Sequence, residues 1–241
     1  MNTQATLQQL RQLKLEGMAR SYEAILQLPV NRHPGAHQLL AQLVQREIEN
    51  KQFKRTRMFL RLSKLRFSST LEEVKCSSER NLTAEQLSLL ADCSWIPRAE
   101  NLIITAATGC GKSFLACALG NQACLMGYKT LYLNMNRFIE KITLARLDGT
   151  FIKVLNQLEK THLLILDDFG LQPLNADTRL ALLQILEDRY QRMATVIASQ
   201  LPVPRWHDYI DDPTLADAIL DRLTARAHIL ELKGKSLRHE K

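Results

Sequence analysis

The first 67 residues carry a helical pattern of apolar positions. Apolar side chains recur every three or four residues between Leu7 and Leu26, and this run closes at the breaker sequence LPVNRHPG. A second run starts near Ala36 and continues to Leu62. Strand-like alternation is scarce here, so we predict a small all-helical N-terminal domain over residues 1–67. The polar, serine-rich stretch 68–80 is predicted to be a linker that lies on the following domain.

From residue 81 onward, short apolar strands alternate with helices. The strands are expected at Asn101–Ala106, Thr130–Leu133, His162–Asp167, Thr195–Ser199 and His228–Leu232. Helical patterns separate them at Lys112–Met126, Asn136–Leu147, Phe151–Glu159, Ala176–Met193 and Thr214–Ala227. This alternation favours a parallel sheet covered on both faces. The predicted fold class is α/β, with a five-stranded parallel sheet between helices over residues 81–241.

Composition agrees with a folded protein of one or two domains. Of the 241 residues, 46% are hydrophobic and 24% are charged. The longest apolar runs fall far short of the roughly 20 residues that cross a membrane, and the N-terminus lacks the apolar core of a secretory signal. Five cysteines form no CxxC pair and are expected to be buried apolar residues in a reducing compartment. We therefore expect a cytoplasmic protein without a membrane partner.

The net charge of +7 is concentrated in one segment. The 21 residues from Arg46 to Arg66 contain eight basic residues and only two acidic ones, Glu47 and Glu49, so most of the excess positive charge lies there. A polyanion is the natural partner, although a solvated helix face is the alternative interpretation. Few aromatic residues accompany these cations between Arg46 and Arg66, here called the basic stripe, which favours duplex phosphates over stacked single-strand bases. The candidate DNA-binding residues are Lys51, Lys54, Arg55, Arg57, Arg61, Lys64 and Arg66.

The sequence AATGCGKS follows an apolar strand and precedes a helix, as a phosphate-binding loop does. In this interpretation Gly109 and Gly111 let backbone N–H groups approach the phosphates of ATP. Lys112 reaches the β- and γ-phosphates, and Ser113 binds Mg²⁺. The strict pattern has glycine at Ala106, where alanine is tolerable if φ stays negative. The candidate nucleotide-binding residues are Ala106, Ala107, Thr108, Gly109, Cys110, Gly111, Lys112, Ser113 and Phe114.

A second acidic motif, HLLILDDFG, ends a buried strand. Two carboxylates there are costly unless a cation compensates them. We predict that Asp167 holds Mg²⁺ and that Asp168 polarises the water that attacks the γ-phosphate. The next strand ends in Ser199 and Gln200, either of which is a candidate to orient that water.

The last predicted helix carries Arg222 and Arg226 without an obvious local partner. An arginine supplied by a neighbouring subunit accelerates phosphoryl transfer by roughly 10³–10⁵. Arg222 is the candidate for that role, and a salt-bridged helix face is the alternative for both arginines. Arg238, in the C-terminal tail, is a candidate to contact the nucleotide of its own subunit.

These motifs together resemble the IstB-like ATPases, helper proteins of bacterial insertion sequences, and their relatives the DnaC helicase loaders. The segments AENLIITAATGCGKSFLACALG and LLILDDFGLQPLNADTRLALLQILEDRY carry much of the resemblance. It implies an AAA+ fold and ATP-dependent homo-oligomeric assembly on double-stranded DNA. It also implies stimulation of a partner transposase, with Arg222 as the arginine finger. The chain departs from the family pattern by lacking prolines in the loop. It also has Asp-Asp where many AAA+ proteins have Asp-Glu, and the shorter side chain suits slow hydrolysis.

Two functions therefore remain compatible with the sequence. If the protein is an ATP-regulated DNA-binding helper of transposition, we expect salt-sensitive, ATP-dependent binding to long duplex DNA. If it is a helicase loader, we expect a stable complex with a helicase and a preference for single-stranded DNA. A nucleotide-binding protein without catalysis is a third, simpler alternative.

Overall fold

A computed structural model of the protein describes residues 3–237. By its contacts the chain forms two compact units, one ending at Met58 and one beginning at Phe59. Residues 59–67, which the helical pattern assigned to the N-terminal domain, therefore group with the second unit. Within residues 3–237, no helix has the length and apolar character needed to cross a membrane.

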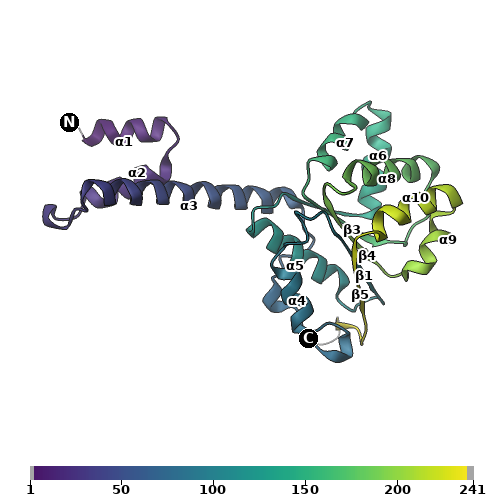
Figure 1. Cartoon of the computed structure of the whole chain (residues 1–241). Helices are drawn as coiled ribbons and strands as arrows, with labels where there is room; N and C mark the ends of the chain where they lie inside the picture. Colours follow the sequence, from purple (N-terminus) through teal and green to yellow (C-terminus); the bar gives the residue numbers. More distant parts are fainter. Residues whose placement is uncertain (1–2, 238–241) are drawn as a thin grey trace. The chain divides into compact units, whose positions relative to one another are not determined.

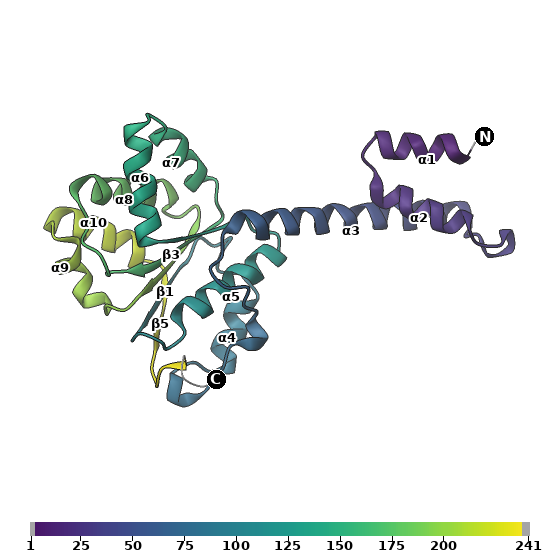
Figure 2. The same ribbon diagram turned by 180° about the vertical axis from the view of Figure 1, so that it is seen from behind.

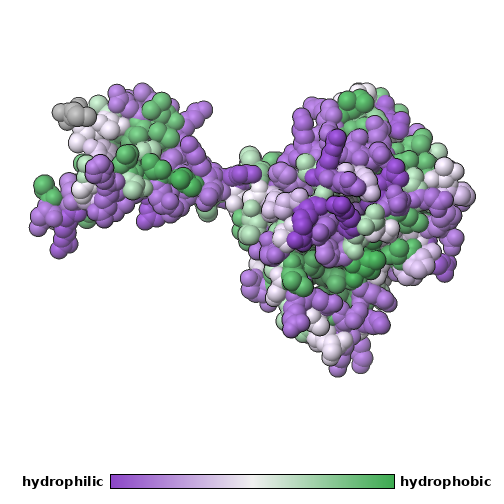
Figure 3. All heavy atoms as spheres, in the orientation of Figure 1, coloured by the Kyte–Doolittle hydropathy of each residue, from purple (hydrophilic) through white to green (hydrophobic). Residues whose placement is uncertain are grey.

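The first unit is helical, as the pattern predicted. It contains α1 (Thr3–Gln12), α2 (Glu16–Leu26), the short 3₁₀ helix η1 (Val30–Arg32) and most of α3 (Ala36–Ser63). The buried carboxylate of Glu47 on α3 accepts hydrogen bonds from the N–H groups of Gly17 (2.7 Å) and Met18 (3.1 Å). These amides have no partner within α2, so Glu47 satisfies them and complements the helix dipole. In the surface view, hydrophilic residues follow much of α3 (Figure 3).

The second unit is an α/β domain, which confirms the predicted fold class. Its five parallel strands are ordered β2-β3-β4-β1-β5. They are β1 (Asn101–Ala106), β2 (Thr130–Asn134), β3 (Leu163–Phe169), β4 (Ala194–Ser199) and β5 (Ala227–Leu232). All residues of β1 and β4 are buried, as expected for strands covered on both faces.

Helices cover the two faces of the sheet (Figures 1 and 2). On one face lie α4 (Ala84–Ala91) and α5 (Lys112–Leu125), and a hydrophobic cluster joins them to the sheet. A second cluster packs the other face against α6 (Met135–Leu147), α7 (Phe151–Glu159), α8 (Ala176–Arg189), α9 (Trp206–Ile210) and α10 (Pro213–Thr224). The short 3₁₀ helices are η2 (Leu71–Glu73), η3 (Ser78–Arg80) and η4 (Val203–Arg205).

Two details differ from the sequence pattern or refine it. The helix expected to reach Met193 ends at Arg189, whose buried guanidinium donates to the carbonyls of Leu158 (2.6 Å) and Thr161 (2.7 Å). The chain turns there to enter β4. Residues 68–80, expected to lie on the following domain, contact α5: the Ser69 hydroxyl donates to the Phe114 carbonyl (3.1 Å).

The approach of α2 to α3 leads to a first prediction. A Cβ atom added at Gly17 would lie 2.4 Å from the Arg46 carbonyl oxygen, whereas one added at Gly35 would meet nothing within 4 Å. We expect Gly17→Ala to destabilise the N-terminal unit by about 1–3 kcal/mol, because steric overlap outweighs alanine's helix propensity. Gly35→Ala, the matched control, should be neutral or slightly stabilising. Urea denaturation followed by far-UV circular dichroism measures both, and equal stabilities would contradict the prediction.

Candidate functional site

The loop AATGCGKS has the backbone that a phosphate loop requires. β1 ends at Ala106, and α5 begins at Lys112. Gly109 and Gly111 adopt φ values of +87° and +86°, which residues with a Cβ atom adopt only with strain. Ala106 has a negative φ as the last strand residue, so the missing glycine creates no strain there. The Lys112 side chain lies at the helix N-terminus and is only 5% exposed.

A C-terminal segment contacts this loop and supports it. The Leu237 N–H donates to the Gly109 carbonyl (3.0 Å), and the Cys110 thiol donates to the Gly234 carbonyl (3.3 Å). Arg80 donates to the Cys110 carbonyl (2.8 Å) from the segment before α4. A Cβ atom at Gly109 would lie 2.2 Å from Ser236 Oγ, so close packing also requires this glycine. Arg238, the predicted nucleotide contact of the tail, lies outside the described residues.

The acidic pair stands at the end of β3, at the same edge of the sheet as the phosphate loop. Asp167 is fully buried, and its carboxylate accepts from the Tyr132 hydroxyl (2.6 Å) and from the Asp168 N–H (2.8 Å). Burial, followed by the hydrogen bond to Asp167, raises the pKa of Tyr132, so the phenol stays a neutral donor. A buried carboxylate held this way has oxygen ligands suited to a magnesium ion.

Asp168 has an unusual backbone. Its φ is +59°, and the pairing of β3 with β4 loses its regular register between Leu166 and Phe169. Left-handed backbone at a residue other than glycine costs about 1–3 kcal/mol and occurs preferentially at functional sites. Because of this irregularity, the Asp168 side chain leaves the backbone in a different direction from the side chain of a regular strand residue.

Arg66 contacts Asp168 of the acidic pair, whereas the sequence suggested only a DNA contact for it. Its guanidinium lies 3.6 Å from the Asp168 carboxylate. Burial alone would lower the pKa of Arg66, but Tyr132 and the carboxylates of Asp168 and Asp167 outweigh it and raise the pKa. Tyr132 and Arg66 are thus site residues whose role no motif indicated.

The two candidates at the end of β4 have different surroundings. Ser199 is fully buried, and its hydroxyl donates to the Phe169 carbonyl (2.7 Å) and accepts from the Leu201 N–H (3.0 Å). Gln200 instead extends to the phosphate loop, where its side-chain oxygen accepts from the Thr108 hydroxyl (2.6 Å). Ser199 therefore ties two strands together, and Gln200 is the polar side chain that the structure brings to the loop.

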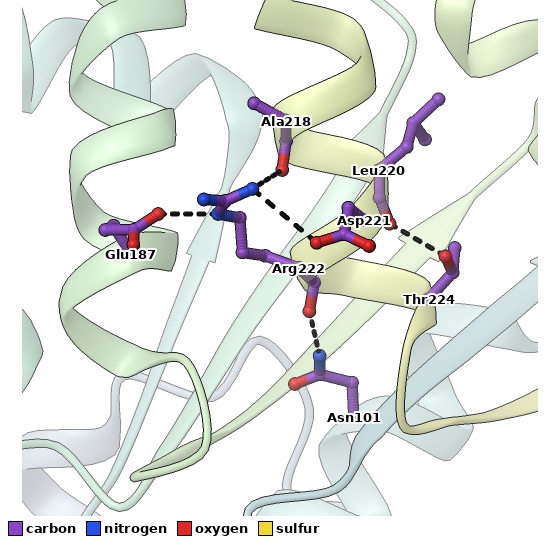
Figure 4. A network of polar contacts seen from close by, with 7 residues as sticks. All are labelled: Asn101, Glu187, Ala218, Leu220, Asp221, Arg222 and Thr224. Atoms are coloured by element: carbon purple, nitrogen blue, oxygen red, sulfur yellow. Dashed lines mark hydrogen bonds and ion pairs between the residues drawn. The ribbon is translucent and has the colours of Figure 1, made fainter.

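Arg222 lies at the opposite edge of the sheet. Its carbonyl accepts a hydrogen bond from the side chain of Asn101, the first residue of β1 (2.9 Å, Figure 4). The strand from Asn101 to Ala106 spans about 17 Å, so Arg222 cannot reach the phosphate loop of its own subunit. Its guanidinium pairs with Glu187 (2.5 Å) and Asp221 (3.6 Å). Arg226 lines the same small cavity as Arg222.

The predicted DNA-binding residues are all exposed. Lys51, Lys54, Arg55 and Arg57 lie on the part of α3 that belongs to the first unit; Arg61, Lys64 and Arg66 belong to the second. Lys51 forms a long ion pair with Glu47 (3.8 Å), and Arg57 lies over the Phe53 ring (5.7 Å). The charges are thus available to solvent, as binding to a polyanion requires.

Comparisons with known proteins agree with this site. A sequence model of the family "IstB-like ATP binding protein" matches residues 8–241. An insertion sequence ATP-binding protein (y4pL) from Sinorhizobium fredii is 42% identical over 233 residues, covering 97% of this chain and 95% of that protein. The ATP-binding protein of insertion sequence IS1162 from Pseudomonas fluorescens is 39% identical over 216 residues, covering 86% of this chain and 94% of that protein. These matches confirm the resemblance that the motifs predicted.

Two solved structures share the fold. AMPPCP-bound DnaA from Aquifex aeolicus superposes with a TM-score of 0.59 at 20% identity, covering 73% of this chain and 53% of that chain. The DnaC helicase loader superposes with a TM-score of 0.57 at 17% identity, covering 69% and 98%. The second unit therefore has the AAA+ fold of these initiators and loaders.

The Tyr132 hydroxyl provides a second prediction. Tyr132→Phe leaves one oxygen of the buried Asp167 without its phenolic donor, so we expect a loss of about 1.5–3 kcal/mol of unfolding free energy. Tyr128→Phe is the control, because within residues 3–237 the Tyr128 hydroxyl makes no hydrogen bond. Urea denaturation of both variants tests this, and a Tyr132→Phe protein as stable as the control would show that the hydrogen bond is dispensable.

Proposed function

This chain belongs to the family of IstB-like ATP-binding proteins, and on that premise we propose that it is an ATP-dependent, DNA-binding helper of insertion-sequence transposition. In this proposal it assembles with copies of itself on duplex DNA and stimulates a partner transposase. The observation that carries the proposal is the division of the ATPase groups between the two edges of one sheet. The phosphate loop and the acidic pair lie at one edge, and Arg222 lies at the other.

The chain is an ATPase, and its residues fit Mg²⁺–ATP. The turn with two positive-φ glycines, followed by the N-terminus of α5, suits phosphate oxygens. Ser113 and the buried Asp167 supply oxygens of the kind Mg²⁺ prefers. When bound, the ion would neutralise negative charge on the phosphates.

The chemistry of the protein groups follows from their positions. Lys112 holds the phosphates by charge from the first turn of α5. Asp168 accepts a hydrogen bond from the attacking water and orients it. Gln200, which follows β4 and contacts the loop through Thr108, orients the same water. Arg222 of a neighbouring subunit stabilises the charge on the transferred phosphoryl group. Without a neighbour the site lacks that cation, so hydrolysis is slow and is stimulated by assembly.

DNA binding is assigned to the exposed basic residues of α3 and the segment after it. Contacts from these cations to phosphates give affinity without sequence readout. The helices of the N-terminal domain, residues 1–67 in the sequence-based division, thus carry most of the DNA surface. The AAA+ domain, residues 81–241, carries the ATP site, with residues 68–80 between them.

Sedimentation with long duplex DNA tests this assembly. We expect a higher-order complex with ATP that is lost without ATP and in Lys112→Ala. If all seven cations contact phosphates, affinity should fall by about three to four orders of magnitude between roughly 50 and 200 mM salt. Lys54→Gln/Arg57→Gln should weaken DNA binding while keeping ATP binding. An absence of ATP-dependent assembly on duplex would refute the proposal; preference for single strands and a stable helicase complex would indicate a loader instead.

A mixing experiment tests the role of Arg222 in the neighbouring site. Arg222→Ala should bind ATP normally but lose turnover by about 10³-fold or more. Asp168→Asn should also be inactive, because it lacks the carboxylate that orients the attacking water. A mixture of the two should regain activity, because an intact site of one variant can meet the intact arginine of the other. If the mixture stays inactive while both variants assemble, Arg222 does not act across the subunit boundary.

A further inference from the structure

The segment between α3 and η2 lies directly on the ATPase unit. The Phe67 ring contacts the Phe114 ring, with centroids 6.2 Å apart, in the first turn of α5. A Cβ atom at Gly120 would come within 2.8 Å of the end of the Leu65 side chain, so this segment packs closely against α5. These contacts, with the Ser69 bond to Phe114, fix the backbone on both sides of Arg66.

Arg66 therefore belongs both to the basic stripe and to the surroundings of the acidic pair. It is the last cation of the basic stripe, and it also reaches the end of β3. α3 ends at Ser63, where Lys64 takes a left-handed φ of 56° and turns the chain toward the sheet. The Arg66 side chain remains 46% exposed while it pairs with Asp168. An anion in solution can thus reach the same guanidinium.

The ion pair itself is weak enough to exchange. Its nitrogen and oxygen are 3.6 Å apart, and both side chains retain solvent exposure. Pairs of this kind contribute little to stability, whereas a guanidinium binds a phosphate in a bidentate, charge-assisted manner. DNA held by the other cations of the stripe would present phosphates at high local concentration.

We propose that Arg66 is an exchangeable counter-ion that couples DNA binding to ATP hydrolysis. Without DNA, Arg66 engages the Asp168 carboxylate and limits its hydrogen bonding to the attacking water. When a DNA phosphate takes Arg66, this ion pair is lost and the Asp168 carboxylate acts on the water. This inference rests on the proposed function, since it requires DNA at the stripe and catalysis by Asp168.

The test compares ATP turnover with and without saturating duplex DNA. Arg66→Gln removes the pair, so we expect basal turnover to rise about three- to five-fold and the stimulation by DNA to approach one-fold. Arg66→Lys keeps a cation and should retain low basal turnover with DNA stimulation. Arg66→Gln/Asp168→Asn should be inactive, because the gain acts through Asp168.

Two controls separate this effect from a general loss of charge. Arg205→Gln removes another exposed arginine–aspartate pair, with Asp208 at 3.7 Å, and should leave basal turnover unchanged. Lys64→Gln removes a neighbouring stripe cation and should weaken DNA affinity, while the fold stimulation at saturating DNA is kept.

The outcomes distinguish the inference from the proposed function. If the wild-type protein fails to bind duplex DNA, the proposed function is wrong whatever Arg66→Gln does. If wild-type turnover is stimulated by DNA but Arg66→Gln keeps both its basal rate and full stimulation, only the counter-ion role is wrong. A lower basal rate in Arg66→Gln would likewise overturn it, since Arg66 would then support catalysis directly.

Discussion

The parallel pairing of β1, β4 and β3 is the constraint on which the rest of the site depends. Because the strands run in one direction, the ends that follow Ile104, Leu166 and Ile197 meet at one edge of the sheet. That edge collects the phosphate loop, the acidic pair and Gln200. The same polarity sends the end of α10, with Arg222, to the opposite edge. In a single subunit, Arg222 is therefore separated from the proposed ATP site by the length of a strand.

Polar interactions at the loop edge join segments that are distant in sequence. The buried Asp167 is satisfied by Tyr132 from β2, and the loop carbonyls at Gly109 and Cys110 are held by the C-terminal segment and by Arg80. The first interaction satisfies a buried carboxylate, and the other two hold carbonyl groups of the loop. The loop and the acidic pair are thus in contact with the segment that follows α3, through Arg80 and Arg66.

The sequence predicted what depends on local pattern. Periodicity located the strands and most helices, and the motifs pointed to the family of ATP-binding proteins that the comparisons show. The sequence could not predict contacts that depend on strand register. Tyr132 meets Asp167 only because β2 pairs with β3. Arg66 was counted with the basic stripe because composition does not show that the chain turns after Ser63. For the same reason, Ser199 and Gln200 could not be separated until their hydrogen bonds were known.

A structure of the protein assembled with a non-hydrolysable ATP analogue on duplex DNA tests the central claim, that the ATP site is completed between subunits, most directly. The account predicts that Arg222 leaves Glu187 and reaches the γ-phosphate held by the neighbouring Lys112. An assembly in which Arg222 keeps its pair with Glu187, remote from every nucleotide, would contradict it.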